Sequence, residues 1–163
     1  MYETEADLAA VQELLDASYE RANAHLRGIW GPESRLDARE LAEELVGIEV
    51  LDLATVTPRG GPRVAPVDGF FYRGKFWFGS SPQSQRFRNI RVNPAVSASL
   101  TRGGETFLVL VHGKAVEVDP RADAAEGFAR MPRELYDFNW DEFHPEAPYA
   151  RIEAGTLLAF KRR

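Results

Sequence analysis

Apolar residues in the first part of the chain recur at helical spacing. Between residues 6 and 26 they fall at helical intervals among many charged residues, as on one face of a helix (Leu8, Val11, Leu15, Ala22, Leu26). Glycine and proline at positions 28, 31 and 32 interrupt this pattern. A second, shorter helix is predicted over 37–46, ended by Gly47. Residues 1–47 are therefore predicted to form a helical extension.

From residue 48 the pattern changes to β-branched and aromatic residues separated by turn-forming residues. Strands are predicted over 48–57, 63–72, 75–80, 95–101, 106–118 and 155–161, and a helix over 122–130. Tight connections at 58–62, 73–74 and 102–105 predict hairpins. Six strands in hairpin order, interrupted by one short helix, favour a small antiparallel barrel over a doubly wound parallel sheet.

The composition is that of a soluble globular protein with one domain overall: 163 residues, of which 44% are hydrophobic and 28% are charged. The chain has no cysteine, which excludes disulfides, thiolate metal sites and a cysteine nucleophile. Its three histidines, His25, His112 and His144, are far apart, so we predict no metal site. No apolar run approaches the roughly 18 residues of a membrane span, and the N-terminus is acidic, so we expect a cytoplasmic protein without membrane partners.

The net charge of −5 is unevenly distributed along the chain. Residues 1–50 carry 12 acidic and 4 basic residues, residues 51–115 carry 3 and 9, and residues 116–163 carry 10 and 7, which gives −8, +6 and −3. A basic segment within an acidic protein indicates a local anion site. The alternative is a solvated, arginine-rich face.

The helix that interrupts the strands carries the clearest chemical signal. Ser81 is predicted as its N-cap, Pro82 as its first residue, and Asn93-Pro94 as its end. A helix start directly after a strand offers free N–H groups, and the side chains nearby add further donors for a phosphate group (Ser80, Ser81, Ser84, Arg86, and Arg63 from a neighbouring strand). An ordinary capped helix with solvated arginines is the alternative. Phe87 and Ile90 are predicted to face the core, and Arg88 and Arg91 the solvent.

Several short motifs in this region resemble the FMN-binding split β-barrel family, which includes the pyridoxamine 5′-phosphate oxidases and related flavin or deazaflavin oxidoreductases. They are Arg-Val-Ala-Pro-Val at 63–67, Phe-Trp-Phe-Gly-Ser at 76–80, Ser-Gln-Arg at 84–86, Asn-Ile at 89–90 and Asn-Pro at 93–94. The resemblance covers roughly residues 48–120 and, more weakly, the final strand. It implies a mainly β fold with flanking helices, in which a six-stranded antiparallel split β-barrel at 48–163 binds the cofactor behind the N-terminal helical extension.

The resemblance also implies a set of cofactor-binding residues. On the strand these are Arg63, Val64, Ala65, Pro66 and Val67, and around the helix start they are Gly79, Ser80, Ser84, Gln85 and Arg86. Arg86 stands where family members usually have a phosphate-binding lysine, and arginine keeps the charge and adds a bidentate grip. The cofactor implied is FMN or the deazaflavin coenzyme F420.

Some positions depart from the pyridoxamine 5′-phosphate oxidases themselves. Gln85 replaces an arginine, Asp68 replaces a strand lysine, Leu108 replaces a flavin-contacting glutamine, and the C-terminal substrate motif is missing. These departures speak against a true pyridoxamine 5′-phosphate oxidase. We expect a flavin- or deazaflavin-dependent oxidoreductase that transfers a hydride to or from a small organic substrate, with the chemistry supplied by the cofactor and no catalytic side chain predicted.

The family usually binds its cofactors at the interface of a homodimer. Residues 70–72 and 109–111 are apolar on both faces of their strands, as a second copy would require, so we expect a homodimer with the cofactor at the interface. The aromatic segment at 136–144 is a candidate lining of the substrate pocket, or else a small hydrophobic cluster under a loop.

Two other classes of function remain open. The same barrel would suit a flavin or haem protein that binds or stores its cofactor without turnover. A barrel with a basic face and exposed aromatic residues between 70 and 78 could also bind single-stranded nucleic acid as an OB-fold does, although the acidic remainder of the chain favours no nucleic-acid partner.

Overall fold

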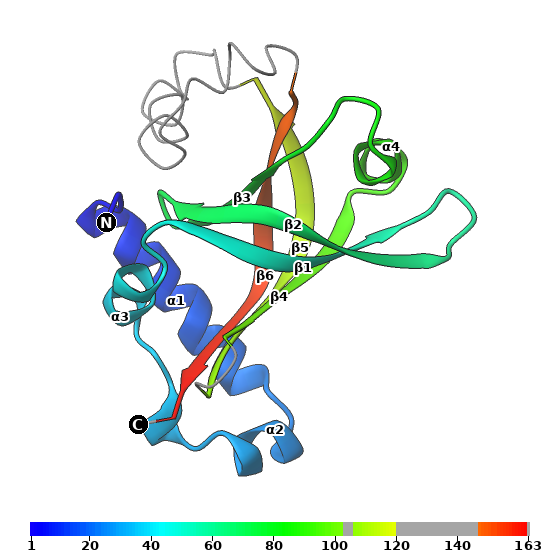
Figure 1. The fold of residues 1–163 in the computed structure, drawn as a ribbon. Coiled ribbons are helices and arrows are strands. Elements are labelled where there is room, and N and C mark those ends of the chain that lie inside the picture. Colours follow the sequence, from blue (N-terminus) through cyan, green and yellow to red (C-terminus); the bar gives the residue numbers. More distant parts are fainter. Residues whose placement is uncertain (103–105, 120–146, 163) are drawn as a thin grey trace.

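Six antiparallel strands form a closed barrel in the computed structural model, which describes residues 1–102, 106–119 and 147–162 (Figure 1). The strands are β1 (Ile48–Val56), β2 (Pro62–Tyr72), β3 (Lys75–Gly79), β4 (Ala95–Arg102), β5 (Phe107–Val118) and β6 (Tyr149–Lys161). Around the barrel they follow the order β1-β2-β3-β6-β5-β4, and pairing of β4 with β1 closes it. The predicted mainly β fold with a six-stranded antiparallel barrel is confirmed.

Alternating side chains explain why these segments form a barrel with a filled interior. In β4, Val96, Ala98 and Leu100 are buried, while Ser97 and Ser99 between them are only partly covered. In β1, Leu51 and Leu53 are buried and Val50 is 59% exposed. The inward face of the sheet is therefore apolar, whereas the outward face carries polar residues on β4 and exposed apolar residues on β1 and β2.

The N-terminal part of the chain folds into short helices rather than one long and one short helix. They are α1 (Glu5–Arg21), α2 (Ala24–Ile29), the 3-10 turn η1 (Pro32–Ser34) and α3 (Ala38–Glu44). The single helix predicted over 6–26 is therefore divided in two: α1 ends at Arg21, and residues 24–26 belong to α2. The side chain of Asn23 accepts a hydrogen bond from the N–H of Leu26 at 2.8 Å and so begins a new helix.

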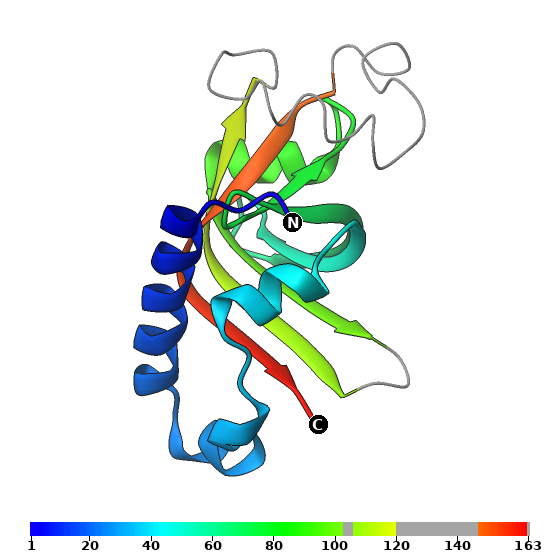
Figure 2. The same ribbon diagram turned by 90° about the vertical axis from the view of Figure 1, so that its left-hand side faces the viewer.

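Helix α1 is attached to the barrel along β6 (Figure 2). Leu8 and Leu15 are buried in the same continuous core as the barrel interior. The Tyr19 hydroxyl donates to the carbonyl of Ala159 at 2.8 Å, and the N–H of Leu157 donates to the Ser18 hydroxyl oxygen at 3.0 Å. The helices therefore share one core with the barrel, and the division at residue 47 stays a prediction.

Strand β6 is longer than the sequence pattern predicted. It starts at Tyr149, six residues before the predicted start at 155, and its first residues pair with β3 through Tyr149, Ala150 and Arg151. The alternating pattern is hard to recognise there because Arg151 and Glu153 carry charges and Gly155 breaks the run. The predicted helix at 122–130 and the aromatic segment at 136–144 lie outside the described residues.

Helix α4 (Gln85–Val92) connects β3 to β4 and begins later than predicted. Ser84, not Ser81, is the N-cap, because its hydroxyl oxygen accepts a hydrogen bond from the N–H of Phe87 at 3.4 Å. The N–H of Ser84 donates to the carbonyl of Ser81 at 2.9 Å, so residues 81–84 form a turn that includes Pro82. This start brings Phe87 onto Phe78, with ring centroids 5.9 Å apart, and thereby anchors the helix to the barrel.

Candidate functional site

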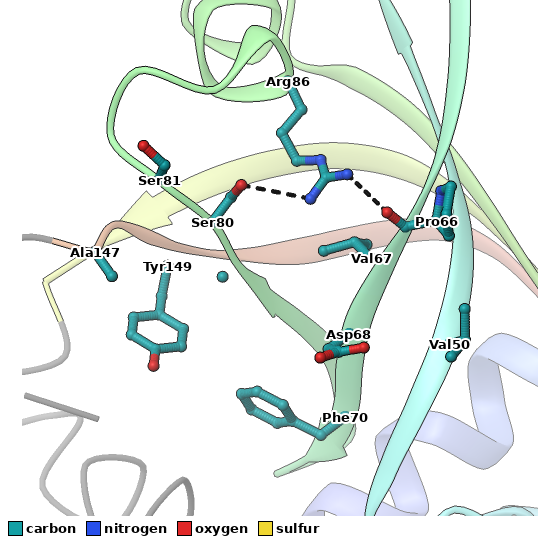
Figure 3. A pocket seen from close by; sticks show the side chains of 11 residues that line it. Val50, Pro66, Val67, Asp68, Phe70, Ser80, Ser81, Arg86, Ala147 and Tyr149 are labelled. Atoms are coloured by element: carbon teal, nitrogen blue, oxygen red, sulfur yellow. Dashed lines mark hydrogen bonds between the residues drawn. The ribbon is translucent and has the colours of Figure 1, made fainter. Parts of the chain in front are cut away.

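A pocket of about 500 Å³ lies on the outer side of the barrel, beside the turn that leads into α4 (Figure 3). Strands β1, β2, β3 and β6 all contribute to it, and its described lining residues are Val50, Pro66, Val67, Asp68, Phe70, Gly79, Ser80, Ser81, Arg86, Ala147 and Tyr149. Val50 and Asp68 are paired across β1 and β2, which places both on the same outward face. The volume falls within the usual range of small-molecule sites, about 300–1,000 Å³.

Arg86 supplies the positive charge of this pocket. Its guanidinium donates through Nη2 to the carbonyl of Pro66 at 2.8 Å, and its Nη1 lies 3.5 Å from the Ser80 hydroxyl oxygen (Figure 3). The side chain is half-buried, and this burial lowers the pKa of Arg86. Neither contact neutralises the charge, so the guanidinium is oriented and remains available to an anion.

Half of the other bases in the basic segment at 51–115 are neutralised by acidic residues from outside it. Four of its bases form ion pairs: Arg73 with Asp7, Lys75 with Glu153, Arg91 with Glu117, and Arg102 with Glu44 and Glu49. Arg86 has no carboxylate partner within the described part of the chain. Within the described residues, the bases of this segment that form no ion pair are therefore Arg86 beside the pocket and the exposed Arg59, Arg63, Arg88 and Lys114.

The start of α4 adds neutral donors near Arg86. Ser84 satisfies the N–H of Phe87, whereas the N–H groups of Gln85 and Arg86 have no partner within the described residues. The hydroxyls of Ser80 and Ser81 line the pocket. Hydroxyls, free N–H groups and a guanidinium together form a donor set suited to a phosphate.

Aromatic side chains form the other wall of the pocket. Phe70 and Tyr149 line it and pack together with Trp77 in a small hydrophobic cluster outside the main core. Tyr149 lies against the backbone of Gly79, where an added Cβ would sit 2.9 Å from the Tyr149 Cε1 atom. Glycine at this position therefore lets the ring approach the strand and shapes the pocket.

The structure gathers five of the ten predicted cofactor-binding residues at this pocket, namely Pro66, Val67, Gly79, Ser80 and Arg86. The other five do not line it in the single chain. Arg63, Val64 and Ala65 lie on the exposed first part of β2, Ser84 caps α4, and the Gln85 amide donates to Asn89 Oδ1 at 2.8 Å. Their role in cofactor binding stays a prediction.

Other lining residues were absent from the predicted set. Val50 and Asp68 could have been found from strand alternation, because Asp68 is two residues from Pro66 on the same face. Tyr149 and Ala147 could not have been found from strand alternation, because only the pairing of β6 with β3 brings them to the pocket.

The surroundings of the pocket bear on the alternative functions. Phe70, Phe71, Phe76, Trp77 and Phe78 are each at most 5% exposed, so they offer no stacking surface to a nucleic acid. Within the described residues no three potential metal ligands form a group, and no helix is long and apolar enough to span a membrane. Arg88 and Arg91, which were predicted to face the solvent, are both exposed, and Arg91 forms an ion pair with Glu117 at 2.7 Å.

The fold and the site define a small closed barrel with a candidate anion-binding pocket, in which Arg86 has no carboxylate partner among the described residues. Its family follows from the sequence as well. The pyridoxamine 5′-phosphate oxidase family model matches residues 38–154, more than two thirds of the chain, so the chain belongs to this family and the resemblance is confirmed. No curated protein matches the chain.

Solved structures of the same fold include proteins with different cofactors. An F420 reductase is 22% identical, with 69% of this chain and 91% of that chain covered and a TM-score of 0.56. An FAD-binding protein from Mesorhizobium loti is 20% identical, with 77% and 93% covered and a TM-score of 0.60. The haem storage protein of Vibrio cholerae is 18% identical, with 80% and 94% covered and a TM-score of 0.60. These similarities show the shared fold.

Proposed function

We propose that this protein is an oxidoreductase that binds FMN or coenzyme F420 and transfers a hydride to or from a small organic substrate. The observation that carries the proposal is Arg86, an oriented and half-buried guanidinium without a carboxylate partner among the described residues, beside a pocket of about 500 Å³. Family membership, an F420 reductase and an FAD-binding protein of the same fold support it.

The residues present fit such a cofactor. Arg86, Ser80 and Ser81 would hold its phosphate through charge-assisted and hydroxyl hydrogen bonds, and Pro66 and Val67 would contact its ring system. When bound, the flavin or deazaflavin ring supplies the hydride chemistry. The chain itself binds and orients the cofactor and limits the access of water. A cytoplasmic location stays a prediction.

We also propose a homodimer that completes this pocket. Two valines on the outward face of the β1–β2 hairpin are largely exposed, Val50 by 59% and Val64 by 67%, and Val50 lines the pocket. Exposed valines beside an open pocket are an unfavourable surface for a monomer. A second copy packed on this face would bury them and cover the cofactor.

The decisive measurement is a titration of the purified chain with FMN and with coenzyme F420, followed by absorbance and fluorescence. Binding of one of them at micromolar concentration is expected, and failure of both to bind would refute the proposal. Arg86→Ala should weaken binding by about 1.5–3 kcal/mol, or roughly 10- to 150-fold, since a hydrogen bond to a charged group is lost. Arg88→Ala removes an exposed arginine from the same helix outside the pocket and is the matched control.

A second candidate is a protein that binds flavin or haem without turnover, favoured by the haem storage protein of the same fold. Neither described histidine, His25 or His112, lines the pocket. Two results together would favour this candidate. Titration with haem would give a sharp Soret band, and no acceptor in a panel of small quinones and dyes would reoxidise the bound reduced cofactor. Reoxidation faster than that of the free cofactor favours the oxidoreductase.

A further inference from the structure

Asp68 places a negative charge in the same pocket as Arg86. It lies on β2, two residues beyond Pro66, whose carbonyl binds the Arg86 guanidinium. Figure 3 shows Asp68 next to Phe70, on the part of the strand that leads away from Arg86. The two charges thus belong to different parts of one cavity, and no ion pair joins them.

The Asp68 carboxylate has no evident structural role. Within the described part of the chain it takes part in no hydrogen bond or ion pair, and its side chain is exposed. In the open pocket water solvates it. A ligand that fills the pocket removes this water, and a carboxylate that loses its water without gaining a counter-charge is strongly unfavourable. A ligand with a positive charge at this position avoids the penalty.

The aromatic wall lies beside the same carboxylate. Phe70 follows Asp68 by two residues on the outward face of β2, and Tyr149 lines the pocket from β6. Aromatic rings next to a carboxylate favour a flat organic cation, because the rings contact its plane while the carboxylate compensates its charge. A strongly hydrated metal ion or an anion would gain nothing from this wall.

We propose that the pocket takes an organic cation as substrate, such as a protonated aromatic amine or a ring with a quaternary nitrogen, and that Asp68 selects it by charge. The identity of this cation as a substrate rests on the proposed oxidoreductase function, whereas its binding at Asp68 does not. Arg86 then holds the anionic cofactor and Asp68 the cationic substrate in one cavity.

A series of probes that share one ring and differ in charge tests this selection. Nicotinate is an anion, nicotinamide is neutral and 1-methylnicotinamide is a cation. Their binding to the full chain is measured by ligand-observed NMR, first without cofactor and then with bound FMN or coenzyme F420. With cofactor bound, the expected order of affinity is cation, neutral, anion, with about tenfold between the cation and the neutral probe. Without cofactor, Arg86 also attracts nicotinate, so only the cation and the neutral probe are compared there, with the same difference expected.

Three variants assign the selection to Asp68. Asp68→Asn keeps the shape and should abolish the preference for the cation, and Asp68→Lys should reverse it toward nicotinate. Asp52→Asn is the matched control, because Asp52 is also an exposed aspartate on the outward face, opposite Pro66 on β1, but does not line the pocket. This control should keep the wild-type order.

The outcomes separate this proposal from the proposed function. Equal affinities for the three probes in the wild type, or a cation preference that persists in Asp68→Asn, would overturn the assignment to Asp68. If the cation binds more tightly than the neutral probe in the cofactor-free chain but neither FMN nor coenzyme F420 binds, the oxidoreductase proposal fails and the cation site stands. If a cofactor binds and the order is absent, the oxidoreductase proposal stands and the cation site fails.

Discussion

Replacing Asn89 by alanine tests how the helix that carries Arg86 is held on the barrel. Asn89 is fully buried, its Nδ2 donates to Thr55 Oγ1 at 2.9 Å, and its Oδ1 accepts from Gln85 at 2.8 Å. Alanine would leave the Thr55 hydroxyl, which is 4% exposed, without this partner. An unsatisfied buried polar group costs about 1–3 kcal/mol, and the small void left behind adds to it, so we expect Asn89→Ala to destabilise the chain by about 2–4 kcal/mol.

Urea unfolding followed by tryptophan fluorescence measures this change, and a double-mutant cycle identifies its cause. Thr55→Val alone leaves the Asn89 amide without its acceptor and should cost about 1–2 kcal/mol. The double variant should be less destabilised than the sum of the single variants by about 1–2 kcal/mol, because the shared hydrogen bond is lost only once. Arg88→Ala is the control: Arg88 is exposed on the same helix and its side chain makes no hydrogen bond or ion pair within the described residues, so the change should stay within about 0.5 kcal/mol.

The reasoning is refuted if Asn89→Ala changes the unfolding free energy by less than about 0.5 kcal/mol, or if the two substitutions are fully additive. A weaker affinity for FMN or coenzyme F420 in folded Asn89→Ala is a further expectation. Its physical reason is that the backbone of α4 positions Arg86, so a loosened helix orients the guanidinium less well.

Two further predictions concern charge and assembly. Hydrogen bonds from Lys161 and Arg102 hold the pKa of Glu44 below its usual 4.5, so its carboxylate stabilises the fold above that pH and loses this effect as the pH falls through the lowered pKa. Glu44→Gln should therefore lower the free energy of unfolding by about 1 kcal/mol at pH 7. It should also make the thermal unfolding midpoint fall less steeply between about pH 5 and 3 than in the wild type, and an equally steep fall in the variant contradicts this. Val64→Asp should convert the dimer to a monomer in analytical ultracentrifugation. Val46→Asp is the control, because Val46 is 56% exposed but lies between α3 and β1, and this variant should stay dimeric. A monomeric wild type would disprove the dimer.

Local patterns in the sequence were sufficient for most of the barrel. Strands β1 to β5 lie within one residue of the predicted bounds at each end. Their alternation is encoded within each strand, and the turn between β2 and β3 is encoded by Arg73 and Gly74, which adopt φ angles of 51° and 74°. Ser80 and Arg86 could be predicted as parts of one site because only one short turn at the end of a strand separates them along the chain.

Packing between distant segments decided what local patterns could not. The sequence predicted Ser81 as the N-cap of α4, but the helix starts at Ser84, and from this start Phe87 packs on Phe78 and Asn89 donates to Thr55. The charge count predicted a basic segment. Four of its nine bases are paired with acidic residues elsewhere in the chain, because folding brings Asp7, Glu44, Glu117 and Glu153 to them.

By itself, then, the sequence determined the family, strands β1 to β5 and the place of Arg86 at the start of a helix that follows a strand, because each depends on residues close together along the chain. Only the tertiary structure decided the composition of the pocket. Strand β6 brings Tyr149 beside Gly79, and the β1–β2 pairing sets Val50 opposite Asp68. These contacts depend on how the closed sheet brings distant segments together, and among the residues that the structure describes they leave Asp68 and Arg86 in one cavity without ion-pair partners.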